Sequence, residues 1–519
     1  MLHNSKFFYN FKNMIISKIL TGKLSIPHMC SKLIIHPYPG KTFFRLCTLL
    51  FTITSTFLNA QTLQQKLDKY LEEYHSQKYV ASISAGVLKK NKIIWLGSDG
   101  YSDIGHHIKA NSKTLYRIAS ISKVITAVAV MQLAEQKKID LDADALKYIP
   151  YFPAKKWKFT VRQILQHTAG LRNYKSGEFN NTVSYSTTEE SVDVISKDPL
   201  EYKPGTKFLY TTLGYNLLAA VIETVSRMKF TDYLRKYIFQ PSDMRSTFPE
   251  YGNKVNDNMA LGYNKNNYRI LQNAPQSDVS IKIAGGGLIS TPEDLLKFSN
   301  CLLEGKLVKR STLDSMLVPT KLPDGTILDS GLGFEIKKDA NGKQFFGHYG
   351  HGTGFMTLLA IYPKDSLAAV DLINTEDRNI DSPAENLASI ALGKPFFEPK
   401  KSLADKMMEI TLYKGLDAAI KYLNVIKKDS VEQYNLTSDE YNSFGYDLLR
   451  IQHSSDAIRW FQLFENIFPS NISALIGTGD SYYNNGNRGY AMKYYRKALR
   501  LDSSNNYSIR MIKKLEKEE

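Results

Sequence analysis

Residues 116–136 read YRIASISKVITAVAVMQLAEQ, and this stretch indicates the fold of the region around it. Strand-like residues lead into Ser120-Ile121-Ser122-Lys123, after which an apolar, glycine-poor segment continues with helical spacing. Because residues three apart on a helix share a face, Lys123 can reach Ser120 Oγ. A helix N-terminus also directs backbone N–H groups at a developing oxyanion. The stretch predicts a nucleophilic serine at the start of a buried helix.

The spacing of serine and lysine is a weak signal by itself, because Ser226-Arg227-Met228-Lys229 repeats it. This second copy falls at the polar end of an amphipathic helix, and nothing around it suggests chemistry. We therefore interpret it as structural and use it as an internal control. Ser120 differs from Ser226 in its flanking residues and in two further sequence elements that follow it at suitable distances.

A mixed α/β region surrounds Ser120 and extends to about Lys400. Before the serine, apolar spacing predicts a helix over 63–77 and then a hairpin whose strands are VASISAGVLKK and KIIWLGS. After it, we expect helices over 213–228 and 292–303, and strands over 344–349, 355–362 and 366–374.

After Lys400 the strand signals stop and helical periodicity takes over, so we place a domain boundary there. Two in-register repeat units are fewer than such arrays need, so we expect a degenerate helical pair over about 402–428 that docks on the preceding domain. The tail is either a platform for a protein partner or a stabilising helical cap, and its shortness favours the cap. The tetratricopeptide period of 34 residues separates Gly445 from Gly479, Ala457 from Ala491, and Phe461 from Tyr495.

The net charge of +16, from 67 Lys+Arg and 51 Asp+Glu, is unevenly distributed over the 519 residues. Residues 1–60 contain seven of the basic residues and no Asp or Glu, which leaves +9 for the remainder. After residue 60 there is no long basic block and no basic helical stripe with interleaved aromatic residues. The sequence therefore argues against a nucleic-acid partner.

Residues 1–60 have the pattern of an export signal. Basic residues run up to Arg45, an apolar core of 13 residues covers 46–58, and Asn59-Ala60-Gln61 predicts cleavage near Ala60. This core is shorter than the roughly 20 residues that span a bilayer, so we expect no stable membrane span after cleavage. Met29 would start a signal of more usual length, and the choice of start stays open. The mature protein is expected to be exported, either periplasmic or secreted.

The chain has three cysteines, Cys30, Cys47 and Cys301. Cys47 lies at the start of the apolar core and not after it, which disfavours a lipid anchor. Removal of the signal leaves Cys301 alone, so we expect no disulfide and a fold that depends on core burial.

Seven segments between residues 62 and 395 occur in one order: YRIASISK, KKIDLDADALKYIP, ILQHTAGL, KPGTKFLYTTLGYNLLAAVIE, AGGGLISTPEDLLKF, GLGFEI and GHYGHGTGFMTLLAIYP. Together they resemble the class C β-lactamase and penicillin-binding serine hydrolases. The resemblance implies an α/β (α+β) fold of the serine β-lactamase/transpeptidase type, with a five-stranded antiparallel sheet flanked by helices and an all-helical lobe. The expected domains are the export region at 1–60, a hydrolase domain at 61–400 and an all-α tetratricopeptide-like domain at 401–519.

The same resemblance implies the catalytic residues. Ser120 would be the nucleophile, Lys123 its neighbour in proton transfer, and Tyr210 of Tyr210-Thr211-Thr212 the candidate general base. The family usually has Tyr-x-Asn at this second motif, so Thr212 is a departure. A Thr hydroxyl is shorter and makes fewer hydrogen bonds than an Asn amide. The departure argues against efficient β-lactam turnover and makes the pattern similar to the β-lactamase-like peptidases.

The third motif, His348-Tyr349-Gly350, lies on a predicted strand where β-lactamases have Lys-Thr-Gly. His351 competes for the leading position, but the spacing to Gly354-Phe355 favours His348, whose imidazole suits acid–base work or contact with a carboxylate. The backbone N–H of His351 would then complete the oxyanion hole with that of Ser120. The expected substrate-binding and oxyanion residues are Ser120, His351, Thr212 and Gly350.

We assign no chemical role to the other histidines and glycines that stand out in the sequence. His167 in QHTAGL borders the site and is expected to be structural, and His106-His107 lacks a third ligand at metal spacing. Gly285-Gly286-Gly287 lacks the ending of a phosphate-binding loop. We therefore expect no metal and no cofactor.

The favoured hypothesis is an exported serine hydrolase in which Tyr210 or Lys123 takes the Ser120 proton, Ser120 attacks, and water releases the acyl group. Lys123 can serve as base only if burial lowers its pKa. The expected substrates are peptides, D-amino-acid peptides, small esters or amides, with β-lactams as acylating ligands. The alternative is a catalytically weak penicillin-binding or scaffold protein whose tail recruits a partner. Thr212 motivates this alternative, and the intact set of Ser120, Lys123 and Tyr210 argues against it.

Overall fold

The computed structural model describes residues 62–251, 258–377 and 380–518 of the chain. The predicted export signal, residues 1–60, lies outside these ranges. Residues 64–519 form one compact unit. Within the described ranges, no helix is both long enough and apolar enough to cross a membrane.

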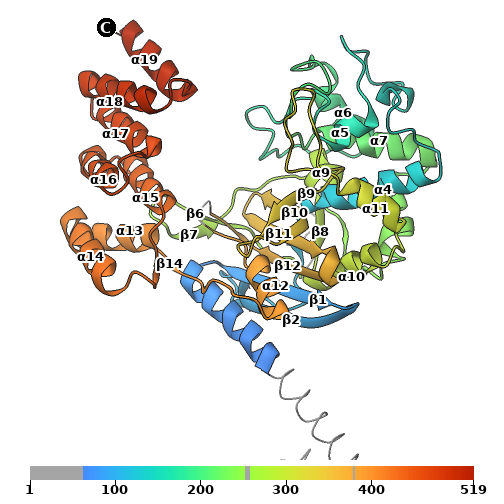
Figure 1. Cartoon of the computed structure of the whole chain (residues 1–519), viewed down its shortest axis with the longest axis horizontal. Coiled ribbons are helices and arrows are strands. Elements are labelled where there is room, and N and C mark those ends of the chain that lie inside the picture. Colours follow the sequence, from blue (N-terminus) through green and yellow to red (C-terminus); the bar gives the residue numbers. More distant parts are fainter. Residues whose placement is uncertain (1–61, 252–257, 378–379, 519) are drawn as a thin grey trace, which may run out of the picture. The chain divides into compact units, whose positions relative to one another are not determined.

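An antiparallel sheet of seven strands lies at the centre of the fold, in the order β3-β2-β1-β12-β11-β10-β9 (Figure 1). The family resemblance implied five strands, and the two additional ones are the short strands at the edges. β3 has two residues, and β9 pairs only with residues 344–347 of β10. The strands are β1 Ser82–Lys89, β2 Lys92–Asp103, β3 Ile108–Lys109, β9 Glu335–Lys338, β10 Gln344–Gly352, β11 Phe355–Tyr362 and β12 Leu367–Ile373.

The predicted hairpin between β1 and β2 is confirmed, and its turn explains the short connection. The turn consists of Lys90 and Asn91, whose φ angles are 48° and 63°. Two central residues with positive φ give the turn a twist that matches paired strands, and Asn tolerates this conformation well. The C-terminal strands pair in the same antiparallel way, with His348 opposite Leu359.

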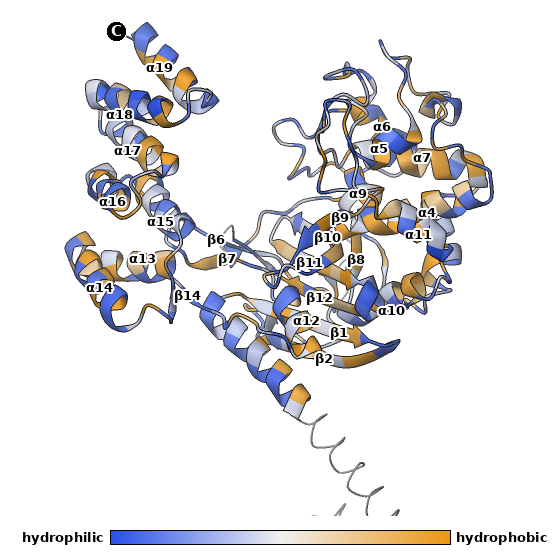
Figure 2. Ribbon diagram, in the orientation of Figure 1, coloured by the Kyte–Doolittle hydropathy of each residue, from blue (hydrophilic) through white to orange (hydrophobic). Residues whose placement is uncertain are grey.

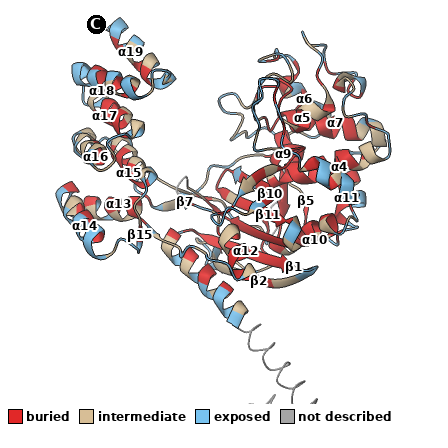
Figure 3. Ribbon diagram, in the orientation of Figure 1, coloured by how far each residue is buried: buried red, intermediate tan, exposed pale blue. Residues whose placement is uncertain are grey.

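Helices cover both faces of the sheet (Figures 1 and 3). Because side chains alternate along a strand, β12 contributes Val370 and Leu372 to the main core beside α10, Pro292–Leu303. Asp371 between them points to the other face, where it accepts the N–H of Ala384 at the start of α12, Ala384–Leu392 (3.0 Å). The helix at 62–78 also packs on the sheet, since the Trp95 indole N–H of β2 donates to Asp68 (2.7 Å).

Helix α4, Ile121–Glu135, is the buried helix that the sequence predicted. It is mostly apolar and nearly every residue is buried, and much of its ribbon in Figure 2 is orange. A helix of this kind must be surrounded by protein. It contacts β10 and β11 on one side and α7 and α9 on the other. Helix α4 therefore connects the sheet to the helical lobe.

The lobe and the other connections of the hydrolase region consist of short helices and two small sheets. The helices are η1 Ala145–Lys147, α5 Val161–Leu165, α6 Thr188–Ser196, α7 Gly214–Ser226, α8 Phe230–Leu234, η2 Arg235–Phe239, η3 Ser280–Lys282, α9 Ile283–Gly286, α11 Arg310–Met316 and η4 Pro363–Asp365. The small sheets are β4 Tyr116–Arg117, β8 Leu288–Ser290 and β5 Phe248–Pro249, and β13 Thr375–Glu376, β6 Tyr263–Lys265 and β7 Leu271–Asn273.

After residue 400 the chain is helical, apart from β14, Lys401–Ser402, which pairs with β15, Tyr434–Asn435. The helical pair expected over 402–428 is present as α13 and α14. The tail helices together bury aromatic residues such as Trp460 and Phe461 in a core of their own. The tail helices are α13 Leu403–Lys414, α14 Leu416–Asp429, α15 Ser438–Arg450, α16 Ser454–Ile467, α17 Ile472–Asn484, α18 Arg488–Leu501 and α19 Asn506–Glu518.

The tail contacts the hydrolase region through buried ion pairs. The connection between β6 and β7 carries Arg269, whose Nε lies 2.7 Å from Asp447 of α15 and whose Nη1 lies 3.0 Å from Asp405 of α13. Lys265 of β6 pairs with the same Asp405 (2.7 Å) and with Asp377 (3.0 Å). The docking that the sequence predicted for the helical pair therefore includes direct charge pairing.

Candidate active site

Ser120 stands where a strained backbone turns into α4. Ala119 before it has a φ of 44°, which is uncommon for a residue other than glycine and is typical of functional sites. Ser120 is the N-cap residue, yet its side chain makes no capping hydrogen bond. Serine usually uses its hydroxyl to cap a helix, so Ser120 Oγ is available for chemistry.

Two side chains hold the Ser120 hydroxyl. Lys123 Nζ, one helical turn further along α4, lies 2.9 Å from Ser120 Oγ. The Tyr210 hydroxyl donates to the same oxygen at 2.8 Å, from the segment that precedes α7. The three residues that were predicted to be catalytic therefore lie together, with Lys123 and Tyr210 both in contact with Ser120 Oγ.

Lys123 is fully buried between the sheet and the lobe. Its Nζ lies 2.5 Å from the Gly285 carbonyl and 3.2 Å from Thr212 Oγ1. Burial, and secondarily the charge of Lys282, lowers the pKa of Lys123 well below its usual value. Thr212 thus contacts the lysine through its hydroxyl, at the position where an Asn amide was expected from the family pattern.

Tyr210 is held by aromatic neighbours in an apolar environment. The His167 ring lies against it, with ring centres 4.5 Å apart, and His167 Nδ1 accepts the Thr211 N–H (3.1 Å). Burial raises the pKa of Tyr210 above its usual value, so the phenol keeps its proton at neutral pH. Burial also lowers the pKa of His167 well below its usual value, and the geometry fits the structural role that we expected.

His348 of β10 is buried beside Tyr210, with ring centres 6.0 Å apart. Its Nδ1 lies 2.6 Å from the Tyr349 carbonyl. A carbonyl only accepts, so Nδ1 carries the proton and Nε2 is left as the acceptor. Burial lowers the pKa of His348, partly opposed by Glu335, so the imidazole is neutral at neutral pH.

The strand register presents the backbone of His351 to the site. The Tyr349 N–H donates to Glu335 Oε2 (3.3 Å) and so points away from β11. In an antiparallel strand, alternate N–H groups point to the same side, so the N–H of His351 also points away from β11, beyond the part of β10 that β9 covers. The N–H of Ser120 has no hydrogen-bond acceptor among the described residues.

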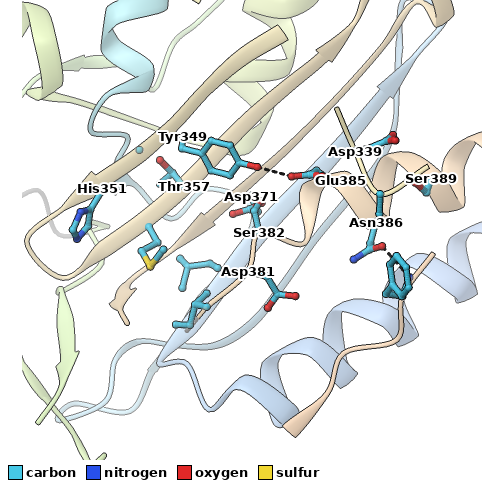
Figure 4. Close-up of a pocket in the computed structure, with 16 residues that line it drawn as sticks. Asp339, Tyr349, His351, Thr357, Asp371, Asp381, Ser382, Glu385, Asn386 and Ser389 are labelled. Carbon is cyan, nitrogen blue, oxygen red and sulfur yellow. Dashed lines mark hydrogen bonds between the residues drawn. The ribbon is translucent and has the colours of Figure 1, made fainter. Parts of the chain in front are cut away.

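His351 also lines the cavity beside Ser120, where its ring centre lies 5.7 Å from that of Phe179, and its side chain pairs with a carboxylate. Its Nε2 lies 2.7 Å from Glu376. Together with Tyr349 it lines a second cavity of about 410 Å³, in which the Tyr349 hydroxyl contacts Glu385 (Figure 4). Of His348 and His351, the two candidates for the third motif, His348 is the one whose imidazole lies near Tyr210.

Gly350 lets β10 approach the segment that leads into α4 closely. A Cβ at this position would lie 2.0 Å from Thr357 Oγ1 and 2.6 Å from the Ile118 carbonyl. A side chain here would therefore displace the strand from Ser120. Gly350 thus contributes to the site through the closeness of the backbone.

Ser120 opens onto a cavity of about 420 Å³ between the sheet and the lobe. Several of its lining residues were not found from the sequence, among them Asn173 and Lys282. Asn173 lines the cavity and accepts the Thr212 N–H through Oδ1 (3.2 Å), and Lys282 lines the wall formed by η3. Neither residue lies in a motif, so no local signal pointed to them. Within the described ranges, no group of three or more His, Cys, Asp or Glu residues is placed to hold a metal ion.

Comparisons with known proteins agree with this fold. The family model described as Beta-lactamase matches residues 64–393. Human mitochondrial serine beta-lactamase-like protein LACTB is 33% identical over 292 residues, which cover 43% of this chain and 53% of that protein. The chain spans about half the length of the curated relatives it matches.

Solved structures of similar fold are also found. The octameric penicillin-binding protein homologue from Pyrococcus abyssi has a TM-score of 0.55 at 24% identity and covers 68% of this chain and 83% of its own. The D-amino acid amidase from Ochrobactrum anthropi has a TM-score of 0.55 at 20% identity and covers 64% and 98%. At these identities the structures show a shared fold.

Proposed function

Since the chain belongs to the beta-lactamase family, we propose that it is a serine hydrolase that forms an acyl intermediate on Ser120. One observation carries the proposal: Ser120 Oγ lies within hydrogen-bonding distance of both Lys123 Nζ and Tyr210 OH. A serine hydroxyl is a poor nucleophile at neutral pH unless a neighbouring group takes its proton. The contact with Lys123 supplies such a group.

Lys123 is the better candidate for the base, because burial acts in opposite directions on the two neighbours of Ser120. It favours the neutral amine of Lys123 and the protonated phenol of Tyr210. A neutral amine has two N–H donors and one lone pair. It can donate to the Gly285 carbonyl and to Thr212 Oγ1 while it accepts the Ser120 proton.

The proposed reaction then proceeds by acyl transfer. Ser120 Oγ attacks the substrate carbonyl as its proton passes to Lys123, and the N–H groups of Ser120 and His351 stabilise the oxyanion. Tyr210 relays a proton from Lys123 to the leaving group. Water afterwards releases the acyl group, with the same residues moving the protons in reverse. We assign neutral His348 to positioning Tyr210 and the substrate.

The proposed substrates are peptides, D-amino-acid peptides, small esters or amides, with β-lactams as acylating ligands. The site requires neither a metal nor a cofactor for this chemistry. The similar fold of a D-amino acid amidase and the hydroxyl at Thr212 support amide or ester substrates over β-lactam turnover. Export, which rests on the predicted signal in residues 1–60, is part of the same proposal.

The experiment that tests the proposal is covalent labelling of the purified chain with a fluorophosphonate and with a fluorescent penicillin, followed by intact mass. We expect an adduct that Ser120→Ala removes. Ser226→Ala is the matched control, because Ser226 has the same spacing to a lysine but ends α7 and accepts the Met228 N–H (3.2 Å). Labelling that is absent from the wild type, or that persists in Ser120→Ala, would contradict the proposal.

A further inference from the structure

A second cavity, which we name the α12 cavity, has a volume of about 410 Å³ and lies on the face of the sheet that α12 covers (Figure 4). The strand register places Tyr349 of β10 opposite Leu358 of β11, and Leu358 opposite Asp371 of β12. Residues that pair directly across antiparallel strands share a face of the sheet, so Tyr349 and Asp371 point to the same side. Glu385 of α12 also lines the cavity, and its Oε1 accepts the Tyr349 hydroxyl (2.5 Å). A cavity of this volume is large enough for a small organic molecule.

Asp371 is 1% exposed and lines the α12 cavity, yet only one of its two carboxyl oxygens is occupied. Oδ1 accepts both the Ser382 hydroxyl and the Ala384 N–H (3.0 Å). Oδ2 has no hydrogen-bond donor among the described residues. A buried polar atom without a partner costs free energy, and a carboxylate oxygen only accepts. Oδ2 of Asp371 is therefore suited to a ligand that brings a donor into the cavity.

The carboxyl groups around the α12 cavity outnumber the cations. No lysine or arginine is among the described residues that line it, whereas four lining residues are acidic, namely Asp339, Asp371, Asp381 and Glu385. Asp381 pairs with Lys78 (2.6 Å), and Asp339 accepts two backbone N–H groups of the turn between β9 and β10 (3.0 and 2.9 Å). The lining histidine, His351, pairs with Glu376 (2.7 Å). Asp371 and Glu385 are thus left without a cationic partner among the described residues.

The rest of the lining favours an organic cation over a metal ion. Met356, Ile373 and Phe397 add apolar surface, and the rings of Phe397 and Tyr349 are aromatic. Among the residues that the structure describes, no group of three or more His, Cys, Asp or Glu could hold a metal. An organic ammonium donates charge-assisted hydrogen bonds to carboxylates, while its hydrocarbon part contacts apolar and aromatic side chains. Both halves of such a ligand find their match in this cavity.

We propose that the α12 cavity binds a small organic amine in its ammonium form, with Asp371 and Glu385 as the hydrogen-bond acceptors. The inference goes beyond the proposed function, because binding in this cavity requires no chemistry at Ser120. The ligand contacts β10 from the face opposite to His348.

The test is isothermal titration calorimetry of the full chain with two amines, each beside its neutral alcohol: phenethylamine with 2-phenylethanol, and cyclohexylmethylamine with cyclohexylmethanol. We expect the wild type to bind at least one amine tenfold or more tightly than its alcohol. Asp371→Asn keeps an oxygen that can accept from Ser382 and Ala384 but removes the charge. It should raise Kd for that amine by about tenfold to a hundredfold and change Kd for the alcohol little.

The pH dependence of binding provides a second readout. Burial raises the pKa of Asp371 to about 7; the hydrogen bonds from Ser382 and Ala384 oppose this, and the charges of Glu385 and Asp381 add to it. Asp371 is charged above that pH, and an alkylamine keeps its proton to about pH 10, so affinity should rise between pH 6 and pH 8. The other titratable groups around the cavity are Glu385, Asp381 with its partner Lys78, Asp339, Tyr349, and His351 with its partner Glu376. Because these groups remain in Asp371→Asn, the rise that this variant loses is the part that belongs to Asp371.

Two control variants locate the binding. Asp314→Asn makes the same change of charge at an exposed position and should leave Kd unchanged. Glu335→Gln removes the carboxylate that lines the Ser120 cavity and should also leave Kd unchanged. A rise in Kd for Glu335→Gln but not for Asp371→Asn would place the amine beside Ser120 and overturn the inference.

Thermal melting shows whether Asp371→Asn folds, and Glu385→Gln provides the same comparison if it does not. The inference is wrong if neither amine binds more tightly than its alcohol, if the folded variants keep the wild-type Kd, or if the rise with pH is as large in Asp371→Asn as in the wild type. Ser120 labelling has no part in this test, so failure here leaves the proposed function intact.

Discussion

Burial favours the uncharged form of both neighbours of Ser120. The same apolar surroundings lower the pKa of Lys123 and raise that of Tyr210, because each charged form loses its hydration. The pair therefore offers an acceptor and a donor to one hydroxyl without placing a net charge beside it. A hydroxyl held in this way can lose its proton to one neighbour while the other stabilises the oxygen.

At the residue scale, the state of Lys123 predicts a pH profile. The protonated amine cannot act as a base, so the rate of fluorophosphonate labelling should rise with pH and level off well below the usual lysine pKa of 10.5. Stopped-flow or timed quenching of labelling between pH 5 and pH 10 measures this.

Lys123→Arg is the variant that isolates this effect, because a guanidinium keeps the charge and does not lose its proton. We expect labelling to slow by about a hundredfold or more, without a rise in the same pH range. A His348→Gln variant should keep the rise, since His348 already is neutral. A rise with pH that is lost in His348→Gln and kept in Lys123→Arg would show that His348, and not Lys123, is the base.

At the element scale, the tail repeats one packing contact. A Cβ on Gly445 of α15 would lie 2.4 Å from the Phe461 ring of α16, and a Cβ on Gly479 of α17 would lie 2.7 Å from the Tyr495 ring of α18. Each glycine thus makes room for an aromatic residue of the following helix. The residues that recur with the tetratricopeptide period occupy equivalent positions, which supports the repeat that we proposed from spacing.

This packing predicts the effect of an added methyl group. Gly445→Ala and Gly479→Ala should each destabilise the chain by about 1–3 kcal/mol, because the aromatic ring must move. Gly489→Ala is the matched control: Gly489 also lies in a helix, but a Cβ there would contact nothing within 4 Å. It should stabilise by about 0.5–1 kcal/mol through helix propensity. Chemical denaturation measures all three, and equal effects at the three positions would argue against the repeat packing.

At the scale of the whole molecule, buried ion pairs join the tail to the hydrolase region. Arg269 and Asp447 have side chains only 8% and 7% exposed, and Asp405 is shared between Arg269 and Lys265. Each buried charge needs its partner, because removing one member of a buried ion pair leaves the other charged and unpaired, which destabilises the fold. This arrangement favours the interpretation of the tail as a stabilising cap.

Arg269→Met tests this role. Removal of one partner should leave Asp405 and Asp447 incompletely paired and destabilise the chain by about 3–5 kcal/mol. Limited proteolysis in the connection at 394–400 should become faster as the tail is released. Arg459→Met, which removes a half-exposed pair with Asp417 inside the tail, should cost less than about 1 kcal/mol and leave proteolysis unchanged. Similar results for the two variants would mean that the ion pairs do not hold the tail.

The sequence by itself determined the parts of the site that depend on local geometry. Ser120 and Lys123 face each other because a helix places residues three apart on one side, and the apolar run after them could only be a buried helix. His348 and the backbone N–H of His351 came from the family resemblance at His348-Tyr349-Gly350, with the spacing to Gly354-Phe355 deciding which histidine leads the motif. Tyr210 came from its motif and the family resemblance, since most of the 32 tyrosines in the chain have no such context.

Only the tertiary structure decided which groups are charged and what surrounds them. The states of Lys123, Tyr210 and His348 follow from burial by segments far away in the chain, and no spacing within the sequence reports that burial. The same holds for Lys282, which lines the Ser120 cavity because η3 leads into α9 and α9 packs against α4, and for the ion pairs that Arg269 makes with the tail. Spacing along one helix or strand sets the direction in which a side chain points. Its solvation and its charge depend on the other elements that the fold packs against it.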